Sequence, residues 1–186
     1  MSCIIAVEST PNPNSYKILL SYSFIGDEMW ECTDFHGASE SPLATSIWSL
    51  NQKSDSIRQI FFHDNMIIVS KHDNAVWADI IDEIKLKIED HFTQNKPLFE
   101  TNSTNTLRNE DKDILQLISE VIRDYIQPAV KSHGGFVQFQ KLDDGVVYIS
   151  MHGSCSGCPS SDITLKNGIE QIVKLYVPGI NSVELI

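Results

Sequence analysis

Two cysteines separated by two residues offer the most specific chemistry in this sequence. They are Cys155 and Cys158, and Gly153 and Gly157 stand close to them. The C-x-x-C spacing lets both sulfurs face one metal ion or metal cluster, or lets them pair as a disulfide. Glycine tolerates positive φ, so the neighbouring glycines permit the tight loop that either arrangement needs. The motif therefore indicates metal, cluster or redox chemistry, and its surroundings have to distinguish these.

The residues after the motif predict a helix that begins beside the thiols. Pro159 suits the first turn of a helix, where its missing N–H is not needed. The positive end of the helix dipole favours the thiolate, which is the form that binds metal. Apolar residues at helical spacing continue over 160–177, and Pro178 and Gly179 then stop the helix.

The elements around this helix predict a small α+β domain. Another helix is expected over 110–130, with Pro128 kinking or ending it near its last turn. The residues 143–145 predict a hairpin turn before the thiol loop, which would lie at one end of the sheet. The strands are expected at 136–142, 146–151 and 180–186, which gives the order α-β-β-α-β.

The first half of the chain predicts a second α+β unit, with its strands first and a closing helix. Ser41 and Pro42 mark a helix start, because serine caps a helix and proline suits its first turn. Apolar residues at helical spacing from Ala75 onward predict the longer closing helix. The strands are expected at 4–7, 16–22, 28–33, 57–62 and 66–70, the first of them buried.

The fold class is therefore α+β, with two small α+β domains joined by a polar linker. The stretch 101–106 consists of Thr, Asn and Ser and has no hydrophobic period, which is typical of a flexible linker. We expect an N-terminal domain over 1–92, a linker over 93–109 and a C-terminal domain over 110–186.

The charge balance argues against two classes of partner. The 186 residues include 25 acidic and 14 basic side chains, a formal net charge of −11. Nucleic acids and anionic membranes both attract Lys and Arg, so neither partner is expected. No apolar run approaches the roughly 20 residues of a membrane span, and residues 1–8 carry no basic targeting pattern. We expect a bacterial cytoplasmic protein, and a mitochondrial matrix location stays open.

The other cysteines and three histidines carry no ligand spacing. Cys3 and Cys32 lie in apolar, strand-like surroundings, so we expect both to act as small core hydrophobes. His36, His63 and His72 are isolated in the sequence, so we expect turn or surface positions for them.

The residues alone leave several interpretations of the thiol pair open. A thioredoxin-type thiol–disulfide oxidoreductase usually carries its motif in a βαβ pattern, whereas here a hairpin precedes it. A structural zinc site needs four ligands, and His133 and His152 are the nearby candidates to join the two cysteines. The third interpretation is an iron–sulfur cluster shared between chains, and the last is a thiol pair without a cofactor.

Ligand counting favours the shared cluster. A four-iron cluster is normally held by four thiolates, and one chain brings two closely spaced ones. A twofold dimer would complete the set by bringing both pairs to one axis. Such a cluster would be exposed and labile, which suits a carrier. Because loop thiols are expected to carry little core packing, Cys155→Ser or Cys158→Ser should lose the cluster and keep the fold.

The flanks of the motif resemble one known family. The runs GSCSGCPSS at 153–161 and TLKNGIE at 164–170, with Pro128-Ala129-Val130 and Gly134-Gly135 upstream, resemble the C-terminal domain of NifU-like (Nfu) iron–sulfur scaffold proteins. The runs ESTPNPN at 8–14 and ASESPLA at 38–44 resemble the Nfu N-terminal domain. The resemblance covers nearly the whole chain, in the same domain order.

The resemblance implies a carrier and not an enzyme. A member of this family would hold a labile 4Fe–4S cluster across a homodimer, with Cys155 and Cys158 as the cluster ligands of each chain. It would receive the cluster from an upstream donor and pass it to client apoproteins, and the N-terminal domain would assist partner contact. This sequence departs from the family at His133 and Phe136, where acidic residues commonly flank the glycine pair.

Overall fold

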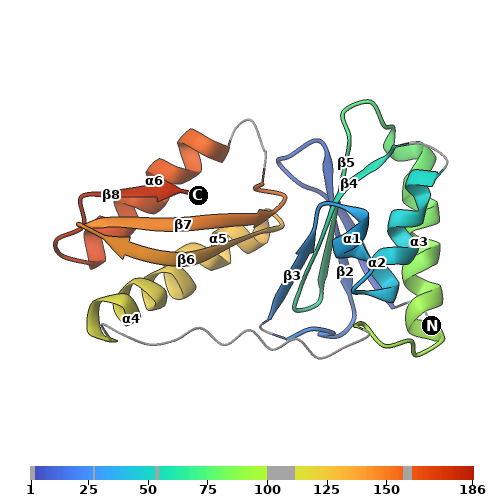
Figure 1. Cartoon of the computed structure of the whole chain (residues 1–186), viewed down its shortest axis with the longest axis horizontal. Helices are drawn as coiled ribbons and strands as arrows, with labels where there is room; N and C mark the ends of the chain where they lie inside the picture. The colour runs from blue at the N-terminus through green and yellow to red at the C-terminus, as the bar shows by residue number, and fades with distance from the viewer. Residues whose placement is uncertain (1–2, 27, 53–54, 100–111, 157–160) are drawn as a thin grey trace. The chain divides into compact units, whose positions relative to one another are not determined.

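The chain forms two compact units, Met1–Thr104 and Asn105–Ile186. The computed structural model describes residues 3–26, 28–52, 55–99, 112–156 and 161–186. Both units combine helices with strands, so the predicted α+β class is confirmed (Figure 1). The proposed limits of the linker stay a prediction, because residues 100–111 lie outside the described residues.

Within the described residues of the first unit, five strands form one antiparallel sheet in the order β1-β2-β5-β4-β3. Asp64 has φ 54°, and this left-handed residue makes the tight turn between β4 and β5 that the sequence predicts. The strands are β1 (Ile4–Ser9), β2 (Ser15–Leu20), β3 (Met29–Cys32), β4 (Ile57–His63) and β5 (Met66–Lys71).

The helices of this unit begin where the sequence supplies caps. The Ser41 hydroxyl accepts a hydrogen bond from the backbone N–H of Ala44, so the predicted helix start is confirmed. The four-residue helix capped by Asp34 was not predicted, because one turn is too short to show a hydrophobic period. The helices are α1 (Phe35–Ala38), α2 (Pro42–Trp48), η1 (Ser49–Gln52) and α3 (Trp77–Thr93).

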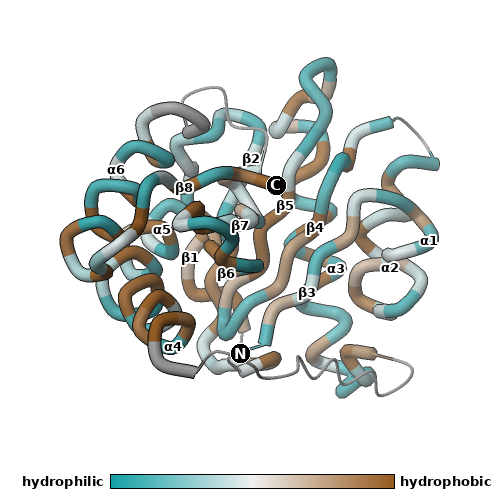
Figure 2. The backbone as a smooth tube through the Cα atoms, turned by 60° about the vertical axis from the view of Figure 1, so that its left-hand side comes forward, coloured by the Kyte–Doolittle hydropathy of each residue, from teal (hydrophilic) through white to brown (hydrophobic). Residues whose placement is uncertain are grey.

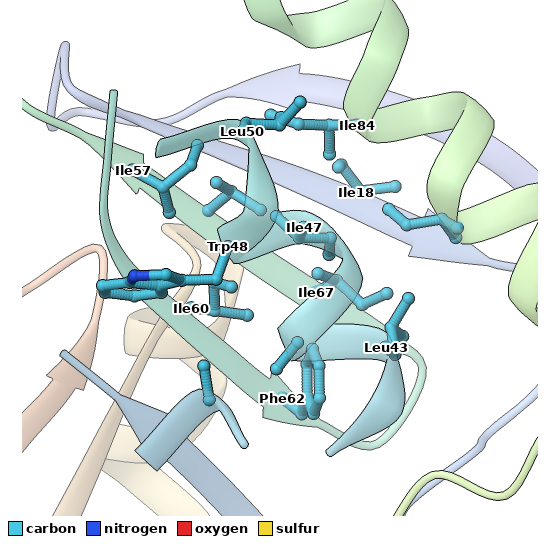
Figure 3. Close-up of a cluster of buried hydrophobic side chains, with 14 of the residues drawn as sticks. Ile18, Leu43, Ile47, Trp48, Leu50, Ile57, Ile60, Phe62, Ile67 and Ile84 are labelled. Carbon is cyan, nitrogen blue, oxygen red and sulfur yellow. The ribbon is translucent and has the colours of Figure 1, made fainter. Parts of the chain in front are cut away.

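The core of the first unit lies between the sheet and helices α2 and α3 (Figures 1 and 3). The hydrophobic residues of β4 and β5 can be followed in Figure 2. Leu98 and Phe99, which follow α3, also pack against this core. Strand β1 was expected to be buried, but it lies at the edge of the sheet, and Ile5 is 62% exposed.

The described part of the second unit confirms the predicted order α-β-β-α-β. Strands β6 and β7 form an antiparallel hairpin, and β8 pairs in parallel with β7. The predicted hairpin turn is present, with Asp144 and Gly145 at φ 47° and 75°. The elements are α4 (Lys112–Val121), η2 (Ile122–Ile126), α5 (Gln127–Ser132), β6 (Gly135–Asp143), β7 (Val146–Gly153), α6 (Ser161–Tyr176) and β8 (Ser182–Leu185).

The first helical segment of this unit does not end at Pro128. It passes through a π-helical stretch, η2, and continues for another turn as α5, in which Pro128 occupies the first turn. Proline lacks the N–H that the α-helical ladder requires, and a wider turn just before it accommodates that loss. The helix therefore carries Val130 into the hydrophobic core of the second unit.

Candidate functional site

Cys155 lies in a turn directly after β7. That strand ends at Gly153, which has φ 68° and pairs with Gly135 at the start of β6. The thiol turn is thus held at one end of the β6-β7 hairpin, as the sequence predicts. Gly157, Cys158 and Pro159 lie outside the described residues.

The Cys155 side chain is buried, with 6% of the residue exposed. It belongs to the hydrophobic core of the second unit, together with Val130 and residues from the sheet and helices. The expectation that loop thiols carry little core packing is therefore wrong for Cys155. The reason is that the turn after β7 folds back onto the start of β6, which places the sulfur against the protein interior.

Gly135 leaves the space in which this sulfur lies. A Cβ added at Gly135 would lie 2.9 Å from Cγ1 of Val130 and 3.2 Å from Cβ of Cys155, and closer still to the Cys155 sulfur. In proteins, a Cβ atom essentially never has a non-bonded heavy-atom neighbour closer than 3.0 Å. The sulfur is therefore packed directly against the backbone of β6.

Ser154 fastens the thiol turn to the residues that precede β6. Its backbone N–H donates to the carbonyl oxygen of Gly134 at 3.0 Å, and its buried hydroxyl donates to the carbonyl oxygen of His133. Within the turn, the N–H of Ser156 donates to the carbonyl oxygen of Gly153 at 3.2 Å. These bonds fix the backbone on both sides of Cys155.

Of the two nearby histidines, His152 lies in β7 and His133 lies just before β6. His152 pairs with Phe136 across the hairpin, and its Nε2 lies 2.9 Å from the Ser150 hydroxyl. The His133 carbonyl accepts the Ser154 hydroxyl. In the part of the chain that the structure describes, no three His, Cys, Asp or Glu side chains gather to hold a metal ion. A zinc site built from Cys155 and these histidines therefore finds no support among the described residues.

The other two cysteines pack in or against the core of the first unit. Burial raises the pKa of the Cys32 thiol to about 12, and its residue is 4% exposed within the first core. Partial burial, followed by the hydrogen bond and negative charge of Glu89, raises the pKa of the Cys3 thiol to about 11. Because Cys32 is buried in that core, the core role expected for it is confirmed, and half-buried Cys3 packs against the same core.

The histidines of the first unit differ from expectation at one position. His63 is buried at the end of β4, and its Nδ1 lies 3.0 Å from the carbonyl oxygen of Glu28. His72 pairs with Asp55 at 3.5 Å, and His36 is exposed, as expected for turn and surface residues. The prediction of a turn or surface position for His63 was wrong because its strand continues one residue further than the sequence pattern suggested.

Sequence reasoning missed the residues that hold the thiol turn. Gly135 was noted only as part of a glycine pair, and Ser154 only as a flanking residue. No local signal identifies them, because their partners Cys155 and His133 lie about twenty residues away along the chain. His91 was also missed, although it extends the buried α3 stripe of Ile84 and Ile88.

Two family models together cover most of the chain. The model described as NifU-like domain matches residues 118–184, and the model described as scaffold protein Nfu/NifU N terminal matches residues 5–95. This chain belongs to the NifU-like (Nfu) family. The two Nfu matches fall in the domain order that the sequence motifs indicate, and the C-terminal match includes both cysteines of the C-x-x-C pair.

The Nfu chain is similar to curated proteins and to solved structures. The NFU1 iron-sulfur cluster scaffold homolog, mitochondrial, of Drosophila willistoni is 33% identical over 184 residues, covering 97% of this chain and 62% of the relative. Its Drosophila simulans counterpart is 34% identical over 189 residues, covering 98% and 65%. This chain therefore spans less than two thirds of those relatives. The solution structure of a NifU-like protein from Saccharomyces cerevisiae is 17% identical, covering 55% of this chain and 89% of that chain, with a TM-score of 0.45.

No helix among the described residues has the length and apolar character that crossing a membrane requires.

Proposed function

We propose that this chain is an iron–sulfur cluster scaffold or carrier. It holds a labile 4Fe–4S cluster between two copies of itself through Cys155 and Cys158, and it delivers that cluster to client apoproteins. The observation that carries the proposal is that the NifU-like match at 118–184 includes the C-x-x-C pair. The scaffold role printed in the names of the Drosophila relatives supports the same function.

The chemistry of the thiols supports the cluster and the dimer. Cysteine sulfur is the usual protein ligand of iron in such clusters, and four thiolates complete a 4Fe–4S site. One chain supplies two from this motif, while Cys32 is buried in the core of the first unit and Cys3 packs against that core. A second copy related by a twofold axis is therefore the proposed source of the other two ligands.

Delivery would proceed by ligand exchange. A client thiolate forms a bond to a cluster iron, and the sulfur of Cys155 or Cys158 leaves the same iron as a thiolate. Each exchange conserves the charge of the cluster, and no electron is transferred. The step needs no catalytic acid, base or nucleophile in this chain, so the proposed role is that of a carrier and not of an enzyme.

The proposal extends to partners and compartment. An upstream donor loads the cluster and client apoproteins receive it, and nucleic acid and membrane are not partners. The domain limits of 1–92 and 110–186 are proposed as the partner-contact and cluster-holding parts. The Drosophila relatives are named as mitochondrial proteins, so we propose a role suited to either the mitochondrial matrix or a bacterial cytoplasm.

Anaerobic reconstitution with iron and sulfide tests the proposal. The expected product is a brown dimer with about four iron atoms per two chains, measured by iron and sulfide analysis alongside solution mass. One cluster per single chain, or no iron uptake at all, would contradict the shared site. A colourless monomer that reduces disulfides catalytically would instead identify the oxidoreductase that the sequence leaves open.

Matched cysteine variants test the ligand assignment. Cys155→Ala and Cys158→Ala should each abolish the cluster absorbance of reconstituted protein. Alanine is preferred to serine at 155, because a hydroxyl in that apolar position adds a cost of its own. Cys32→Ala is the control, since it also removes one buried sulfur and should leave iron content unchanged. Full iron content in either motif variant would refute the assignment.

A further inference from the structure

Gly135 has no backbone reason to be glycine. The positive-φ glycines of the described chain include Gly134 at 76° and Gly153 at 68°, and Gly135 is not one of them. Any residue could adopt its backbone conformation, so the requirement at this position comes from space. The space that a side chain would fill holds the Cys155 sulfur and a methyl group of Val130.

Hydrogen bonds on either side of the contact fix the backbone of both Cys155 and Gly135, and so hold the sulfur against Gly135. The two bonds from Ser154 to the carbonyl oxygens of Gly134 and His133 tie the thiol turn to the residues before β6. Gly135 itself pairs with Gly153 in the β6-β7 ladder. The backbone on both sides of the contact is therefore fixed, and the sulfur can leave only by rotation of its own side chain or by opening of the turn.

We propose that Gly135 is a positioning residue that seats the Cys155 sulfur inside the second unit and shields it while no cluster is bound. This inference rests on the proposed function, because it concerns one of the two thiols that would hold the cluster. The seat is the space between Gly135 and Val130 that the sulfur occupies. Gly135 acts through Cys155 and would itself contact no cargo.

The seat has a consequence for the chemistry of the pair. Thiol oxidation and disulfide exchange both need access to sulfur, and the seated sulfur belongs to a residue that is 6% exposed. An iron atom needs the same access, so Cys155 must leave the seat before it can bind cargo. Shielding one of the two thiols would suppress their premature oxidation to a disulfide while leaving the fold intact.

Alkylation of the full-length, iron-free chain tests the seat. Iodoacetamide labelling of Cys155 is followed by peptide mass spectrometry in the wild type and in Gly135→Ala. A methyl group in the seat displaces the sulfur, so labelling of Cys155 should become about tenfold faster or more, as expected when a closed site is forced open. Gly168→Ala is the control, since an added Cβ there meets nothing within 4 Å, and its labelling rate should equal that of the wild type.

A double-variant cycle separates the sulfur contact from general crowding. Gly135→Ala should lower the urea midpoint of the second unit, and the loss should be smaller when Cys155→Ala has already removed the sulfur. Val130 is present in both backgrounds, so its own clash with the new methyl group cancels. Equal losses in both backgrounds would show that the sulfur does not occupy the seat.

Two further results would overturn the proposal. One is an unchanged labelling rate in a folded Gly135→Ala protein. If that variant does not fold, the test uses the wild type alone. Labelling of Cys155 in the folded wild type as fast as in the urea-unfolded chain would contradict a seated sulfur. These measurements use iron-free protein. A failure of cluster reconstitution would therefore count against the proposed function, whereas the labelling and unfolding measurements test the seat independently.

Discussion

His91 is a buried histidine in the last turn of α3. In the described part of the chain its Nε2 has no hydrogen-bond partner, and its ring meets Phe92 edge-on. Burial, and to a lesser degree the positive charge of Lys96, lowers the pKa of His91 below its ordinary value of 6.5. The folded first unit therefore holds this ring neutral at a pH where the unfolded chain binds a proton.

This histidine predicts acid sensitivity of the first unit. Its stability contribution is fully present above the unfolded pKa of 6.5, and it is lost as pH falls from there through the lowered folded pKa. Urea unfolding of the first unit should show a lower free energy at about pH 5.5 than at about pH 7.5, and His91→Leu should reduce that difference. The control His36→Leu removes an exposed histidine and should leave that difference in unfolding free energy unchanged. If His91→Leu also left the difference unchanged, the assignment to His91 would be contradicted.

Cys155 and Ser154 show how strongly a residue's role depends on its packing. A thiol in a short loop beside glycines suggests exposure, yet Cys155 belongs to the core of the second unit. Ser154 is also buried, and it is stabilised there because both its N–H and its hydroxyl find carbonyl partners. The cluster site proposed here thus begins from a packed state and not from a pair of thiols in solvent.

At the scale of the element, helix α2 depends on its cap. Ser41 is buried and accepts the N–H of Ala44 at 3.3 Å, and the helix buries Leu43, Ala44, Ile47 and Trp48 against the sheet. Ser41→Ala should cost about 1 kcal/mol of unfolding free energy, whereas Ser41→Gly should cost only about 0.3 kcal/mol. Urea unfolding of both variants measures this, and an equal loss in the two would count against the cap as the cause.

The π-helical stretch is the element that brings the helix to the thiol. Without the wider turn of η2, Pro128 would break the hydrogen-bond ladder and the helix would end before Val130. Because the helix continues, Val130 reaches the core and forms one wall of the seat. A local irregularity in one helix therefore contributes to the position of a side chain in a distant loop.

At the scale of the whole molecule, each unit has its own core. The hydrophobic cluster of the first unit draws on residues between Cys3 and Phe99, and that of the second unit on residues between Ile118 and Leu185. A compact unit with its own core is able to fold alone. The chain is therefore expected to behave as two folding units and not as one.

Separate fragments test this independence. Fragments 1–99 and 112–186 should each fold, and each should unfold in urea at the midpoint that its unit shows in the full chain. The second fragment should also take up iron and sulfide on reconstitution, since it contains both motif cysteines. Circular dichroism and iron analysis measure these outcomes, and a fragment that is unfolded alone would show that its unit needs the other.

The sequence by itself determined the features that depend on neighbouring residues. Helical spacing in α3 and α6, the Ser41-Pro42 start of α2 and the Asp144-Gly145 turn all follow from local backbone and side-chain preferences. The C-x-x-C pair also indicates metal, cluster or redox chemistry locally, because ligand spacing is a property of a few consecutive residues. The flanking runs identified the family for the same reason.

Only the tertiary structure decided which residues surround the thiol. The contact of Gly135 with Cys155 and the bond from Ser154 to His133 join residues about twenty positions apart, and the hairpin alone brings them together. Burial is likewise a property of the assembled core, so a loop cysteine and a strand-end histidine, Cys155 and His63, were both placed too near the surface. Packing is a long-range property that local preference does not encode, which is why the seat of Cys155 became visible only in the folded chain.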